Sequence, residues 1–338
     1  MRKEVLFAIF FGLFIGLIFA FGIFRVNSAM KSKDSVANPD TNNADTSSSK
    51  TNDLKTLTLL KPADNSAVAS DIIQVSGITH AQSYIVTTGG TSDTVQKSKI
   101  DGSFEFDYEI DPSVNYLNIT SVTADNQRVS TSLEVAYSSE IANPNKDQEV
   151  NDTKDSADQK LEATQNRIEF FQGTVTDLTE SGVQLKDKNG DIEQVSYSVA
   201  STSFAKFGVK TSKISAVDIA IGDFILAMGH IKANSLLEAV RIVVTQPQTP
   251  LEVKIFYGTV IEKNKADFGI DEKDSGKVSL NINNNTNTYT GDVSVPTKSR
   301  YTNVSEGDTV IGTYTTEKDV NSARKIYILP SPTPTPES

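Results

Sequence analysis

The residues best suited to holding a metal ion lie in one short acidic turn. Asp187, Asn189 and Asp191 alternate along the sequence DKNGD, and carboxylate and amide oxygens at this spacing are typical of a calcium loop. A complete loop also needs a bidentate glutamate at its twelfth position, where this chain has Ser198. The Asn189-Gly190 pair is a hairpin signal in its own right. We therefore expect a hairpin turn and keep the metal site as the alternative.

Other residues that could do chemistry are few. Cysteine is absent, which excludes disulfides, thiolate metal sites and a cysteine nucleophile. The two histidines, His80 and His230, have no obvious partner, and the sequence has no nucleotide-binding, zinc-protease or serine-hydrolase motif. Acids are plentiful, but glycoside hydrolysis needs two of them about 5–10 Å apart, which a sequence does not encode. We predict no catalytic residue and no cofactor, with an extracytoplasmic hydrolase as a further alternative.

The charge of the chain also excludes a class of partner. The formal net charge is −11, and no stripe of basic residues interrupts the acidic composition. Because proteins that bind nucleic acids neutralise phosphates with lysine and arginine, we expect no nucleic-acid partner.

The elements that would have to position these residues begin with a membrane segment. Residues 5–24 form an uncharged apolar run, long enough as a helix to cross a hydrocarbon core of about 30 Å. We expect an uncleaved single-pass signal anchor, with a cleaved signal peptide as the alternative. The short head, residues 1–4, is basic and is expected to stay in the cytoplasm. The domains that follow would then be extracytoplasmic, beyond a polar disordered stalk at residues 25–56.

The next segment, residues 57–137, reads as a β-sandwich. Short apolar runs alternate with turn residues, and Asp101-Gly102 precedes the period-two alternation of Phe104, Phe106 and Tyr108. The order P-x-D, I-x-V-S-G, D-G-S-F and N-x-L-N-I-T resembles the immunoglobulin-like accessory domains of bacterial surface proteins and of some secreted glucan-degrading enzymes, the glucodextranase type. The resemblance implies a spacer or adhesive module.

The remainder of the chain contains one module written twice. FFQGTV at 170–175 is matched by IFYGTV at 255–260, and its glycines are 258 − 173 = 85 residues apart. A Gly-Asp pair recurs at the same separation, and Val195 and Tyr197 of the third predicted strand are aligned with Val278 and Leu280. The landmarks of the repeat are Gly173 and Gly258, Gly222 and Gly307, and Asp223 and Asp308.

Each copy, 168–245 and 252–329, has five or six predicted strands and no long helix. A domain so small and so rich in strands removes its exposed edges by closing into a barrel, so we expect two OB-like barrels, with a second sandwich as the alternative. The frame of G-T-V followed by G-D-x-V/I resembles a bacterial domain family of unknown function found in tandem in exported proteins, a resemblance that implies fold alone. A polar linker at 138–167 and a proline-rich tail at 330–338 complete the chain.

The sequence therefore predicts a mainly β protein with an N-terminal transmembrane helix, one immunoglobulin-like sandwich and two tandem OB-like barrels. We expect a membrane-anchored surface protein that acts as a spacer and interaction scaffold at the cell envelope, facing a protein or glycan partner. The alternative is a glycan- or cell-wall-binding module carried by the barrels, although the chain lacks tryptophan, the best side chain for stacking on sugars.

Overall fold

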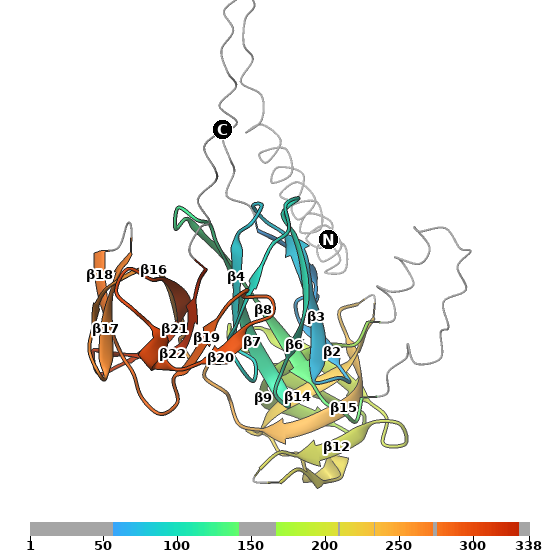
Figure 1. Ribbon diagram of the computed structural model, residues 1–338. Helices are drawn as coiled ribbons and strands as arrows, with labels where there is room; N and C mark the ends of the chain where they lie inside the picture. Colours follow the sequence, from blue (N-terminus) through green and yellow to red (C-terminus); the bar gives the residue numbers. More distant parts are fainter. Residues whose placement is uncertain (1–56, 142–166, 209, 233, 273–275, 331–338) are drawn as a thin grey trace, which may run out of the picture. The chain divides into compact units, whose positions relative to one another are not determined.

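The computed structural model describes residues 57–141, 167–208, 210–232, 234–272 and 276–330 (Figure 1). Strands dominate these residues, and their helical parts are two single-turn 3-10 helices, η2 (Ala216–Asp218) and η3 (Tyr301–Asn303). The prediction of a mainly β chain is confirmed.

Several predicted segments lie outside the described residues. These are the head, the apolar run and the stalk (residues 1–56), most of the polar linker (142–166) and the tail from residue 331. No helix among the residues that the structure describes is long and apolar enough to cross a membrane.

The first folded segment is built from two sheets packed face to face. One sheet has the order β1-β3-β6, and on the other β2, β8, β7, β4 and β5 are neighbours in that order. Alternate residues point between the sheets, so Val75, Ile85, Leu117 and Val135 are fully buried in a shared core. The strands are β1 (Thr58–Lys61), β2 (Ser66–Val68), β3 (Ile72–Ile78), β4 (Tyr84–Thr88), β5 (Thr94–Lys97), β6 (Ser103–Glu109), β7 (Ser113–Val122) and β8 (Arg128–Tyr137).

The first repeat closes a ring of five strands. Strand β9 pairs with β10, β10 with β11, β11 with β15, β15 with β14, and β14 again with β9. The β11–β15 pair is parallel and the others are antiparallel. The strands are β9 (Glu169–Thr179), β10 (Gly182–Lys186), β11 (Ile192–Tyr197), β12 (Ser203–Lys206), β13 (Ser212–Lys213), β14 (Phe224–Ile231) and β15 (Leu237–Thr245).

The second repeat closes the same ring in the same order. Strand β16 pairs with β17, β17 with β18, β18 with β22 in parallel, β22 with β21, and β21 with β16. The parallel contact is the shortest, a single pair between Asn281 and Ser322. The strands are β16 (Lys254–Lys263), β17 (Asp267–Glu272), β18 (Gly276–Asn281), β19 (Asn287–Thr290), β20 (Thr297–Ser299), β21 (Thr309–Glu317) and β22 (Val320–Ile328).

Even the irregularities of the two rings coincide. The β9–β10 pairing skips Thr176, and the β16–β17 pairing skips Ile261, which is 261 − 176 = 85 residues later. The β14–β15 pairing skips Val240, and the β21–β22 pairing skips Arg324, which is 324 − 240 = 84 residues later. Because such bulges re-aim the strand and its side chains, their recurrence shows that the two copies share detailed geometry as well as strand order.

The pairing registers correct the sequence alignment of the third strand by two residues. Val195 pairs with Val183 in the first repeat, and Leu280 pairs with Phe268 in the second. Val195 therefore corresponds to Leu280 rather than to Val278. A slip of two residues keeps every side chain on its original face, so the alternating pattern alone could not detect it.

Candidate functional site

The predicted metal ligands lie in a hairpin turn between β10 and β11. The carboxylate of Asp187 accepts hydrogen bonds from the backbone N–H groups of Asn189 and Asp191, both at 2.8 Å. Gly190 occupies the left-handed region, with φ of +92°. Asp187 thus serves the turn itself, and among the residues that the structure describes no group of three or more acidic or histidine side chains could hold a metal.

The two glycines that mark the repeat lie where neighbouring strands come closest. A Cβ added at Gly173 would lie 2.5 Å from the carbonyl oxygen of Lys186, and one at Gly258 would lie 2.2 Å from that of Asp271. A carbon atom cannot approach a backbone oxygen so closely without shifting the strand, so both positions require glycine.

The Gly-Asp pairs shape the turn that leads into the fourth strand of each ring. Gly222 and Gly307 have φ of +95° and +91°. The Asp223 carboxylate accepts a hydrogen bond from the N–H of Ala220 at 2.9 Å, and Asp308 accepts the equivalent bond from Ser305 at 2.8 Å. Each aspartate bonds its own turn, as short polar side chains commonly do.

The landmarks of the repeat therefore do not converge on a reactive centre. The places where chemistry-bearing side chains from distant segments do meet are the two seams between the sandwich and the repeats.

The first seam joins the sandwich to the first repeat through backbone and apolar contacts. Strand β2 pairs with β9 in antiparallel orientation. The N–H of Ala67 donates to the carbonyl of Ile168 at 2.8 Å, and the N–H of Phe170 donates to the carbonyl of Asn65 at 3.1 Å. Behind this junction, one buried cluster contains residues of both parts: Ala67, Val114, Ala136, Ile141, Ile168, Phe170, Ala205, Leu226, Met228 and Val243.

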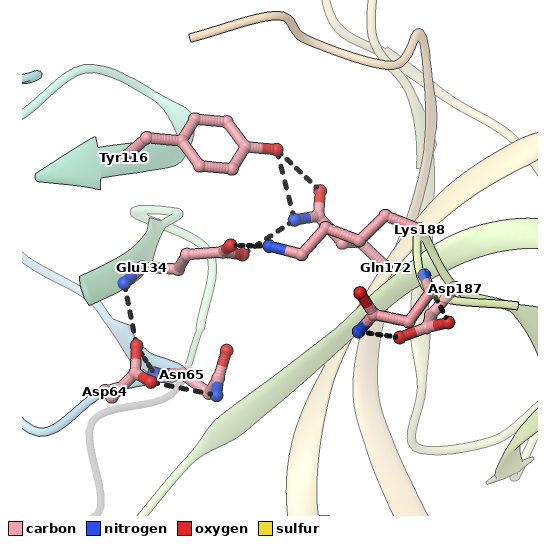
Figure 2. A network of polar contacts seen from close by, with 8 residues as sticks. Asp64, Asn65, Tyr116, Glu134, Gln172, Asp187 and Lys188 are labelled. Atoms are coloured by element: carbon pink, nitrogen blue, oxygen red, sulfur yellow. Dashed lines mark hydrogen bonds and ion pairs between the residues drawn. The ribbon is translucent and has the colours of Figure 1, made fainter. Parts of the chain in front are cut away.

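A polar network borders this cluster and centres on Glu134 of β8 (Figure 2). One carboxylate oxygen of Glu134 accepts a hydrogen bond from Gln172 Nε2 at 2.9 Å, and the other pairs with the ammonium of Lys188. The Gln172 amide also donates to the Tyr116 hydroxyl at 3.1 Å. Asp64 supports the arrangement by accepting a hydrogen bond from the Glu134 N–H at 2.8 Å.

The contacts of this network also affect the protonation of its charged groups. The hydrogen bond and the charge of Glu134 raise the pKa of Lys188, so its ammonium stays protonated and is a poor nucleophile. Burial raises the pKa of Glu193 in the adjoining groove of about 360 Å³, and Asp187 and Asp191 raise it further. A general acid of this kind would act with a second carboxylate. Among the other carboxylates that line the groove, Glu134 is engaged on both oxygens, Glu169 pairs with Arg167, and Asp64 and Asp187 accept backbone hydrogen bonds.

The second seam joins the other end of the same sandwich sheet to the second repeat. Its buried cluster again takes residues from both parts: Val86, Val95 and Val122 of the sandwich, and Val293, Ile311, Tyr327 and Leu329 of the repeat. Tyr84 of β4 packs on Tyr257 of β16, with ring centroids 5.8 Å apart.

Two charged contacts reinforce the second seam. Asp93 is 2% exposed and accepts hydrogen bonds from Arg324 Nε and from the Thr313 hydroxyl, each at 2.7 Å. Arg128 pairs with the buried Glu272 at 2.9 Å. A carboxylate buried to this extent requires such partners, because an uncompensated buried charge is costly.

The two seams use the same face of the module. On the outer sides of the first, fourth and fifth ring strands, residues that contact the sandwich in the first repeat have counterparts 85 or 84 positions later that contact it in the second. The matched pairs are Phe170 and Ile255, Gln172 and Tyr257, Leu226 and Ile311, Met228 and Thr313, and Val243 and Tyr327. We call this surface the docking face.

The docking face was not predicted, although the sequence contains a signal for it. Phe224–Ile231 contains the run FILAM without alternation, and all of Ile225, Leu226, Ala227 and Met228 are buried. A strand that is apolar on both faces is covered on both faces, so the run indicated a neighbour outside the barrel.

Comparisons with known proteins add no assignment to these observations. No protein-family model matches the chain, and no curated protein matches it.

Proposed function

We propose that this protein is a membrane-anchored extracytoplasmic scaffold at the cell envelope, in which one sandwich and two barrels form a single spacer and interaction body. The apolar run at 5–24 supports the anchor, and the polar residues 25–56 support a stalk that lifts the folded part from the bilayer.

We infer that the sandwich is immunoglobulin-like and that the repeats are OB-type barrels. Two packed sheets support the immunoglobulin-like assignment. One has three strands in the order β1-β3-β6, and the other has β8-β7-β4 at its centre. For the repeats, support comes from the small five-stranded ring, with its third and fifth strands parallel, in both copies.

The observation that carries the scaffold proposal is the shared docking face. Both copies turn the same face towards the sandwich, and the described residues between 57 and 330 belong to one compact unit. Domains that pack in this way transmit position and orientation, which is the property that a spacer or a platform requires, and independent domains on flexible linkers would not provide it.

A glycan-binding role for the usual ligand face of OB barrels has less support. That face is formed by the second and third strands of the ring, here β10 with β11 and β17 with β18. The aromatic residues of these strands, Tyr197 and Phe268, are buried in the barrel cores, so the outer face has no aromatic platform for a sugar ring.

The topology can be tested with introduced cysteines, because the chain has none of its own. The variant Lys213→Cys should react with a membrane-impermeant maleimide on intact cells, and Glu4→Cys should react only after permeabilisation. Labelling of Glu4→Cys alone on intact cells would reverse the proposed orientation. If neither variant is labelled on intact cells, the proposed surface location is wrong.

A further inference from the structure

A polar groove lies between the sandwich and the second repeat, beside the second seam. Its volume is about 540 Å³, within the range of sites that bind small molecules. The sandwich contributes Ser92 and Asp93, and the repeat contributes Asn285, Thr315, Arg324 and Lys325. Hydrogen-bond donors and acceptors thus enter the groove from both walls.

The bulge of β22 aims Arg324 towards the groove. Arg324 is the residue that the β21–β22 pairing skips, and its guanidinium donates to Asp93 from Nε at 2.7 Å and from Nη2 at 3.3 Å. Because a guanidinium has five N–H donors, this pairing leaves others for a ligand. The pair also fixes the plane of the guanidinium in advance, which reduces the entropy lost on binding.

Lys325 is held in a similar way. Its ammonium donates to the Ser92 hydroxyl at 2.5 Å and lies 5.4 Å from the centre of the Tyr289 ring. The sandwich and the repeat therefore order this side chain together, and the groove exists in this form only while the repeat is docked.

The first repeat shows that the fold does not demand these residues. The positions equivalent to Asn287, Thr315 and Arg324 are Ser203, His230 and Val240, on the same strands and at the same bulge. The same barrel thus forms with a small hydroxyl, an imidazole and an apolar residue in their place. The polar set is a specialisation of the second copy.

The charges of the groove select among ligands. Arg324 and Lys325 are balanced by Asp93 and Glu317, and the other polar lining residues are uncharged amides and hydroxyls. A phosphate- or sulfate-rich polymer would meet no net positive charge here, and the whole chain, at −11, would repel it. Amides combined with a guanidinium–carboxylate pair suit a ligand that both donates and accepts hydrogen bonds.

We propose that this groove binds a neutral, hydroxyl-rich glycan. The inference rests on the proposed docking of the second repeat, because both walls are needed. Docking can nevertheless hold without glycan binding, so the two can fail separately.

The test uses the full-length chain in detergent on an array of neutral hexaoses (malto-, cello-, xylo- and chito-series) and of two polyanions, heparin and polygalacturonate. We expect retention by at least one neutral series and none by the polyanions. The double variant Asn285→Ala, Thr315→Ala should weaken that retention at least fivefold, since it removes two hydrogen-bonding side chains. The matched variant His230→Ala, at the position equivalent to Thr315 in the first repeat, should leave it unchanged.

Three results would overturn the proposed glycan site. They are no retention by any neutral series, preference for a polyanion, and equal binding by the double variant and the unaltered chain. The distance between spin labels in the double variant Lys99→Cys, Lys298→Cys, measured by pulsed electron resonance, separates the two proposals. If the distance distribution is narrow while no glycan binds, the docked scaffold stands and the glycan site falls. If the distribution is broad in the otherwise unaltered chain, the docked arrangement itself is wrong.

Discussion

Gly173 and Gly258 illustrate what a single residue contributes to this module. Each lies on the first ring strand, opposite a carbonyl oxygen of the second strand that leaves no room for a side chain. Alanine at either position must displace a paired strand or open the barrel, whereas the backbone freedom of glycine is of secondary importance here.

We predict that Gly173→Ala and Gly258→Ala each lower the free energy of unfolding by about 1–3 kcal/mol, the usual cost of overpacking. Urea unfolding followed by tyrosine fluorescence would measure this, because the chain has no tryptophan. Gly208→Ala is the control, since its added Cβ would meet the nearest backbone oxygen only at 3.8 Å and should change stability by less than about 0.5 kcal/mol. Equal effects at all three glycines would contradict the close-approach explanation.

Tyr327, on the docking face of the second repeat, gives a prediction for alkaline pH. Burial, followed by the neighbouring Tyr289, raises the pKa of Tyr327 to about 12. The unfolded chain, with a tyrosine pKa near 10, then loses this proton first as the pH rises. Stability is therefore retained below about pH 10 and falls between about pH 10 and 12, by about 2 kcal/mol for this residue.

Unfolding midpoints measured across that pH range would test the prediction, with Tyr327→Phe as the comparison. The variant removes the titrating hydroxyl, so its stability should fall less steeply above about pH 10. Parallel curves for the two proteins would show that Tyr327 does not carry the effect.

Among the features of single residues, the sequence predicted the hairpin turn well. The Asp187–Asp191 segment was expected to be a hairpin turn, and it has the local hydrogen bonds that its residue types favour. The partners of Glu134 and Asp93 were beyond prediction, because Gln172 and Lys188, or Thr313 and Arg324, are remote from them in the sequence and share no pattern with them.

At the scale of elements, the junction between β2 and β9 is easily disrupted by a single substitution. Its backbone bonds involve few residues, and on β2 the N–H of Ala67 points to β9 while the neighbouring residues pair with β8. The substitution Ala67→Pro removes this donor and leaves the β8 pairing in place.

We predict that Ala67→Pro lowers the hydrogen-exchange protection of the Phe170 amide by at least tenfold, while the β8 amides keep their protection. Mass spectrometry of exchanged peptides from β8 and β9 would measure both. Ala67→Gly keeps the N–H and serves as the control. Loss of protection throughout the sandwich would mean that the proline had disrupted more than the junction.

Most strands followed from the alternating pattern, although each repeat has seven strands where five or six were predicted. Two further features of the elements did not follow from the pattern. The two-residue slip in the third strand kept every face unchanged and was therefore invisible to periodicity. The polar stretch Asn287–Thr290 forms strand β19, although its side chains bury little surface and Thr288 is its only buried residue. Backbone pairing with β20 and β22 holds this strand in place.

At the scale of the whole molecule, the second repeat depends on the sandwich through Asp93. We predict that Asp93→Ala weakens docking by about 1.5–3 kcal/mol, because it leaves Arg324 and Thr313 without their charged acceptor. A glutamyl endopeptidase should then cut after Glu252, in the segment that connects the repeats, faster than in the unaltered chain. Asp107→Ala, which removes an exposed carboxylate of the same sandwich, should leave the cleavage rate unchanged.

The arrangement of the three parts was the least predictable feature of the sequence. Composition and periodicity report which residues are apolar, but a docking face and a barrel core use the same residue types. The two are separated only by geometry, which places Ile225 inside the barrel and its neighbour Leu226 against the sandwich.

Both repeats are held on the sandwich by one shared face, the docking face. The most direct test is the distribution of distances between spin labels, measured by pulsed electron resonance in the double variants Lys99→Cys, Lys298→Cys and Lys99→Cys, Lys213→Cys, which join the sandwich to each repeat. We predict a single narrow distribution for each pair, and a broad one for the first pair when Asp93→Ala is added. Broad distributions in the otherwise unaltered chain would show that the domains move independently and would contradict the account.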